Sequence, residues 1–155
     1  MTLQASEDAD KTRAMSRWKL ILEDNLHASH TGRLIVKAYE NGKNDNYVNG
    51  IIQDTVAKKA TGTLLKRAGS IMRFVVWHRS SSKEPTWPVT EVMAYDYVKH
   101  LHEQRKGVTA ASAFVEALKF CQYVFQIDGC SDVTSSSRIA GAAHAQFVSK
   151  QAQAT

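Results

Sequence analysis

Proline and cysteine are scarce in this chain of 155 residues, which contains two of each. Two cysteines that do not form a Cys-x-x-Cys pair exclude a scaffold built on disulfides. Glycine is limited to eight residues, so the chain has few of the residues that interrupt helices. With abundant alanine, valine, lysine and glutamine, these scarcities favour helices over a β-sandwich or barrel.

Long apolar runs are also missing. No stretch approaches the roughly 20 residues that a membrane-spanning helix requires, so no membrane partner is expected. The N-terminal segment is polar and acidic and lacks the hydrophobic core of a signal peptide. We therefore expect an intracellular protein, located in the nucleus if the source is eukaryotic. The length fits one domain, or one domain with an extension.

Acidic residues are absent from one long stretch of the chain. Residues 55–83 contain no Asp or Glu but seven cations, whereas the whole chain has a net charge of +5. A local excess of this kind suits a polyanion such as nucleic acid. A solvated helix face is the alternative interpretation. The cations are Lys58, Lys59, Lys66, Arg67, Arg73, Arg79 and Lys83.

Apolar residues at helical spacing predict an all-α fold. Four helices between Thr61 and Lys150 are expected to form a bundle with short connections. Residues 1–57 are expected to be an N-terminal extension that is partly helical, with residues 1 to about 11 disordered. The expected helices cover about 12–29, 32–40, 46–59, 61–80, 91–106, 110–127 and 136–150.

The helix expected at 61–80 is strongly amphipathic. On a helical wheel its apolar residues fill one arc, and Lys66, Ser70, Arg73 and Trp77 fall on the opposite arc. Either Thr61 or Thr63 is expected to cap it, as Thr90 and Thr109 are expected to cap the two helices that follow. The pattern indicates a helix with a basic outer face.

Tryptophan on or near this face has two interpretations. An aromatic ring beside Arg and Lys can stack on a base. A tryptophan near a helix end more often packs under a neighbouring helix. For Trp77 and Trp87 packing is the favoured interpretation.

Catalytic and metal-binding patterns are not found in the sequence. There is no phosphate-binding glycine loop, and the histidine pairs at 27/30 and 100/102 have no third ligand nearby in the sequence. The carboxylates are scattered and show no acid–base pair. We therefore expect no catalytic residue, no metal, no cofactor and no small-molecule substrate.

Four segments, in order, resemble the helices of the core-binding domain of tyrosine recombinases, also called phage-type integrases. The first is TGTLLKRAGSIMRFVVW, at residues 61–77, with a Thr and Leu start, a basic pair, and then Phe and Trp. The second, at 88–101, places a capping Thr before a pattern of Tyr and Leu. The third covers 108–121, followed by the stop QIDG at 126–129, and the fourth covers 135–144.

This resemblance implies a four-helix, SAM-like core-binding domain over residues 58–152. Its partner would be double-stranded DNA, bound for recombination or integration of a mobile element, with other recombinase protomers as a second partner. In the family a further domain supplies the catalytic Arg, a His-x-x-Arg pair and the nucleophilic Tyr. None of these is expected here, because all five tyrosines lie in or before the helical region. The chain is thus expected to be the DNA-grasping part of a recombinase, as a fragment or a degenerate copy, without catalysis of its own.

The expected contacts with DNA form two rows. In the first row the basic residues bind phosphates, and Ser70 donates a hydrogen bond. Arg138 and Lys150, on the last helix, form the second row. The alternative function is a helical protein–protein interaction module, in which an apolar groove binds a partner helix. The basic residues of the first row are Lys58, Lys59, Lys66, Arg67 and Arg73.

Overall fold

The structure, a computed structural model, describes residues 2–107 and 109–154, with side chains as far as Ala145. This part of the chain is all-helical, as predicted, and its only β pairing is an isolated bridge between Ser29 and Ile127. The elements before residue 60 are α1 (Leu3–Glu23), η1 (Leu26–Ala28), α2 (His30–Glu40) and α3 (Asp45–Thr55). Those after it are α4 (Thr61–Ser81), α5 (Glu91–Glu103), α6 (Ala110–Phe120), η2 (Cys121–Phe125), α7 (Cys130–Thr134) and α8 (Ser137–Ala154).

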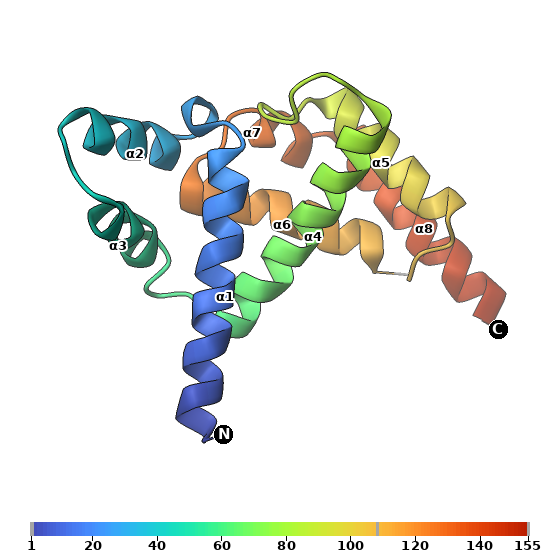
Figure 1. Ribbon diagram of the computed structural model, residues 1–155. Helices are drawn as coiled ribbons and strands as arrows, with labels where there is room; N and C mark the ends of the chain where they lie inside the picture. The colour runs from blue at the N-terminus through green and yellow to red at the C-terminus, as the bar shows by residue number, and fades with distance from the viewer. Residues whose placement is uncertain (1, 108, 155) are drawn as a thin grey trace.

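Helix α4 occupies the middle of the molecule (Figure 1). Helix α1 packs along it on one side, α6 packs against it on another, and α5 follows it after a loop. The pair α2 and α3 lies beyond α1, whereas α5 and α8 pack together at the opposite end. No helix within the described ranges has both the length and the apolarity of a membrane span.

One hydrophobic core joins the first sixty residues to the rest. Trp18 of α1 is fully buried, and its indole lies 5.1 Å from the ring of Phe120 and 4.9 Å from that of Phe125. Its Nε1 donates a hydrogen bond of 3.0 Å to the carbonyl of Leu64. A buried indole usually needs such a partner. A division of the chain near residue 57 stays a prediction, but residues on both sides of it contribute to the same core.

Side-chain caps explain several helix starts. Ser29, Asn44 and Thr90 each accept a hydrogen bond from the backbone N–H three residues later, at the starts of α2, α3 and α5. The cap at Thr90 was predicted. The cap expected from Thr61 or Thr63 was wrong, because the N-cap residue of α4 is Ala60. Thr109 is the N-cap residue of α6, as predicted, but its side chain makes no capping hydrogen bond.

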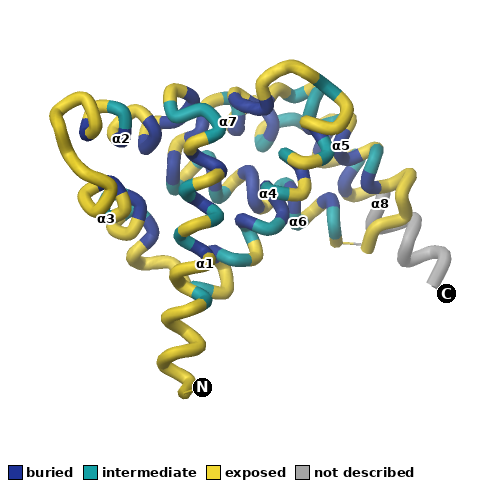
Figure 2. Tube along the Cα trace, viewed as in Figure 1, coloured by how far each residue is buried: buried dark blue, intermediate teal, exposed yellow. Residues whose placement is uncertain are grey.

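The largest difference from the expected helices is at the N-terminus. Residues 1–11 were expected to be disordered, yet α1 begins at Leu3, capped by the hydroxyl of Thr2. Helix-forming residues and local pairs such as Gln4 with Asp8 stabilise these first turns of α1, although none of their residues is buried. Figure 2 shows these first turns as exposed, and Ala14 is the first buried residue.

Other helix ends are displaced by a few residues. Helix α5 ends at Glu103, before the expected stop at Gly107, because Arg105 adopts a left-handed conformation (φ 52°). Helix α6 continues as the π-helical turn η2 and ends at Gln126, which is also left-handed (φ 54°). The short helix α7 was not predicted, and it begins after Gly129. A Cβ at Gly129 would lie 2.0 Å from the carbonyl oxygen of Val89, so only glycine fits there.

Candidate nucleic-acid interface

The cationic stretch identified in the sequence forms the end of α3, a turn and most of α4. Lys58 and Lys59 lie in the turn, where both are exposed. Lys66 and Arg73 are seven residues apart on α4 and therefore lie on one face of the helix, separated by about 10 Å along its axis. Both are exposed, whereas Arg67 is half-buried and lies about a quarter turn away from Lys66.

These five cations have no acidic partner among the described residues. Every described ion pair within 4.0 Å involves other basic groups. Uncompensated cations close to one another raise the local positive potential and attract anions. We call this set the α4 cationic surface, and it consists of Lys58, Lys59, Lys66, Arg67 and Arg73.

Arg79, the next cation along α4, differs from this set. Its guanidinium forms an ion pair with Asp24 at the C-terminal end of α1. The pair links the two helices near the end of their contact. Arg79 therefore contributes to helix packing, and the α4 cationic surface ends at Arg73.

Ser70 does not lie on this surface, so its expected position on the exposed arc was wrong, and its role as a hydrogen-bond donor to phosphate stays a prediction. Its exposed fraction is 5%. Helix α4 packs against both α1 and α6, so its buried arc is wider than one apolar stripe and includes position 70. The Ser70 hydroxyl is 3.4 Å from Nη2 of Arg73, which places it beneath a cation of the surface.

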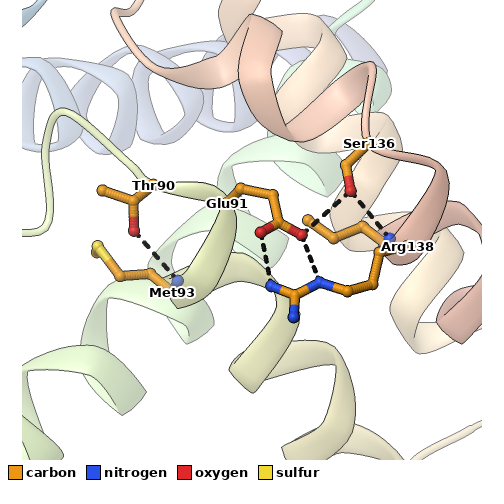
Figure 3. A network of polar contacts seen from close by, with 6 residues as sticks. Thr90, Glu91, Met93, Ser136 and Arg138 are labelled. Atoms are coloured by element: carbon orange, nitrogen blue, oxygen red, sulfur yellow. Dashed lines mark hydrogen bonds and ion pairs between the residues drawn. The ribbon is translucent and has the colours of Figure 1, made fainter.

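In the second predicted row of contacts, Arg138 already has an acidic partner. Arg138, at the start of α8, forms two hydrogen bonds with Glu91 of α5, from Nε to Oε1 (2.8 Å) and from Nη2 to Oε2 (2.6 Å), as Figure 3 shows. Its guanidinium also lies 3.9 Å from the ring centre of Tyr95. Lys150, the other member of this row, lies beyond the described side chains.

The pKa shifts of Glu91 and Arg138 agree with a stable ion pair between them. The hydrogen bond from Arg138 lowers the pKa of Glu91, against desolvation, which raises it, and Ser136 adds a second hydrogen bond that lowers it. The hydrogen bond to Glu91 raises the pKa of Arg138. Arg138 thus joins α5 to α8, and its charge is already balanced.

Both tryptophans in question are packed, as the favoured interpretation held. Trp87 is buried, 6.1 Å from the ring of Phe74. Trp77 is half-buried between rings of its own protein, 5.1 Å from Tyr97 and 5.5 Å from His100. Trp77, Tyr97 and His100 help to line a groove that was not predicted from the sequence. Its lining comes from three helices, so no local pattern marks it.

In the described ranges, no group of three or more His, Cys, Asp and Glu side chains is placed to hold a metal ion. The fold and the site together define an all-α protein with an uncompensated cationic surface on a central helix. Comparison with protein-family models, with curated proteins and with solved structures gives no match.

Proposed function

We propose that the chain binds duplex DNA through the α4 cationic surface and has no catalytic activity of its own. The observation that carries this proposal is that five neighbouring cations, from Lys58 to Arg73, have no carboxylate partner among the described residues. Phosphate contacts of this type supply the affinity of nonspecific DNA binding. The separation of Lys66 and Arg73 along the axis of α4, about 10 Å, is close to the distance covered by three successive phosphates along one DNA strand.

The finer part of the proposal is the role that the recombinase resemblance implies. Helices α4, α5, α6 and α8 would correspond to the four helices of a SAM-like core-binding domain, and the chain would grasp DNA for recombination or integration. Support for this part consists of the order of helix motifs at 61–77, 88–101, 108–121 and 135–144. If DNA contacts the α4 cationic surface alone, we expect weak and mostly nonspecific binding, with a Kd on the order of 10⁻⁶ to 10⁻⁴ M at physiological salt.

Charge reversal on α4 tests the proposal. The variant K66E/R67E/R73E should bind a fluorescein-labelled duplex at least about a hundredfold more weakly than the parent, because three phosphate contacts become repulsive. The matched control is K37E/K43E/K119E, which makes the same change in net charge at three exposed lysines outside α4. Circular dichroism checks that both variants fold. Equal affinities of the two variants in fluorescence anisotropy would show that net charge alone, and not this surface, binds DNA.

A further inference from the structure

A groove of about 720 Å³ lies between α4, α5 and the start of α6. Its apolar lining includes Met72, Val76, Leu101 and Ala110. Val76 is 67% exposed, which is unusual for a valine on a central helix. Together with Met72 it also borders a second groove, of about 450 Å³, on the α1 side of α4. Val76 therefore forms an apolar ridge with a hollow on either side.

The larger groove is bordered by positive charge. Arg73, Lys106 and the half-buried His100 line it, and none of its described lining residues is acidic. Tyr97 also lines this groove, and burial raises its pKa, whereas the positive charge of Arg73 lowers it. The occupant that complements this lining has acidic groups around an apolar face.

Two other occupants complement the groove less well. A second copy of the chain would bring its own Arg73 and Lys106 toward those of the first copy, and like charges oppose such a contact. An unpaired base would need an open aromatic face. The Trp77 ring, however, packs against Phe74, Tyr97 and His100, and the remaining lining is largely aliphatic.

We propose that this groove binds an acidic amphipathic helix of a partner protein, with the apolar side chains of that helix against Val76 and Leu101 and its carboxylates against Arg73 and Lys106. Binding of a helix in a groove takes anchors at i, i+3 or i+4, and i+7. Met72, Val76 and Leu101 give the larger groove an apolar surface against which such anchors pack. The proposal does not depend on DNA binding, because only Arg73 belongs to both surfaces.

The test is a display library of random peptides of about sixteen residues, long enough for four helical turns. The library is sorted on the full-length protein and then against the variant V76D/K106E. We expect enriched peptides that combine Asp or Glu with apolar residues at helical spacing. In fluorescence anisotropy an enriched peptide should bind V76D/K106E at least about tenfold more weakly than the parent. The matched control V92D/K99E changes a valine of similar exposure (59%) and an exposed lysine, both outside the groove, and should bind like the parent.

Several outcomes overturn the proposal. Enrichment of basic or neutral peptides, or of none, shows that the groove does not select an acidic helix. Equal binding of an acidic peptide to V76D/K106E and V92D/K99E places its site elsewhere. Binding of single-stranded oligothymidylate that V76D/K106E abolishes assigns the groove to nucleic acid, and a dimer that dissociates only in V76D/K106E assigns it to a second copy. Duplex affinity should be the same for the two double variants, so failure here is distinct from failure of the DNA proposal.

Discussion

Two groups of cations in this protein have opposite surroundings. Lys66 and Arg73 of α4 are exposed and have no acidic partner among the described residues. Arg138 of α8 is half-exposed but is held by both carboxylate oxygens of Glu91. The charge of a cation with a fixed carboxylate partner is neutralised, and the pair joins two helices. A cation without such a partner can still bind an external anion. The surroundings of a basic residue, more than its exposure, distinguish the two roles.

The comparison gives a rule for the whole basic stretch. Arg79 lies on the same helix as Lys66 and Arg73 but pairs with Asp24, so it belongs with Arg138. Counting cations in the sequence therefore overestimates the number of residues free to bind an anion near the C-terminal end of the basic stretch. The five residues of the α4 cationic surface remain, in the turn before α4 and along α4 as far as Arg73, and Lys83 lies apart from them in the loop after α4.

The largest expected effect is the salt dependence of duplex binding. Five phosphate contacts predict a slope of about −4.5 in a plot of log affinity against log salt, which is a loss of roughly 500-fold between about 50 and 200 mM salt. Fluorescence anisotropy with a labelled duplex measures it. If Arg138 and Arg79 also bound phosphates, the slope would be steeper by about two. A flat profile would remove the electrostatic basis of the proposed function.

A smaller effect is expected when an unpaired cation is given a partner. Gly62 is exposed in the first turn of α4, with open space around its Cα, and lies four residues before Lys66. The variant G62E places a carboxylate within reach of Lys66 and near the positive end of the helix. We expect duplex affinity to fall by about fivefold, while the free energy of unfolding rises by about 0.5–1 kcal/mol.

The control for this change is G62A, which has the same gain in helix propensity without the charge. It should be stabilised to a similar extent and bind duplex DNA like the parent. Thermal unfolding and anisotropy measure the two properties separately. Equal DNA affinities of G62E and G62A would mean that Lys66 does not contact phosphate.

The sequence predicted the middle of most helices but not their ends. An apolar stripe marks α4 and the Thr90 cap marks α5 locally, and the structure has helices there. The ends depend on single left-handed residues, and here these are Arg105 and Gln126, which no propensity would select. The N-terminal turns of α1 were missed because they bury nothing, so they lack the periodic pattern that marks a packed helix.

The candidate site was predictable only where its signal is local. The absence of acidic residues over 55–83 can be read directly from the sequence, and it marked the five cations of α4 and its preceding turn. The pairing of Arg138 with Glu91, 47 residues away, depends on how α5 packs on α8. A helical wheel assumes one buried stripe, and it therefore put Ser70 on the exposed face. In the structure α4 packs on two sides, which buries Ser70.

The smallest effect is expected when Arg138 loses its partner in E91Q. Arg138 then becomes a cation without a carboxylate, as Lys66 is, but it lies on α8, away from the surface on α4. If position as well as charge determines binding, duplex affinity should stay within about twofold of the parent. Stability should fall at neutral pH, because the folded pKa of Glu91 is lowered by Arg138.

The pH dependence of that loss follows from the sign of the shift. A carboxylate whose folded pKa is lowered contributes stability above its ordinary value of 4.5, and the contribution disappears as the pH falls through the folded pKa. In thermal unfolding, the parent should therefore have a higher Tm than E91Q at neutral pH. The two Tm values should converge once the pH falls below the folded pKa of Glu91. A clear gain of duplex affinity in E91Q would show instead that Arg138 is a DNA contact restrained by Glu91. Arg138 and the α4 cations would then have the same role, and Arg138 would differ only because Glu91 is bound to it in the parent.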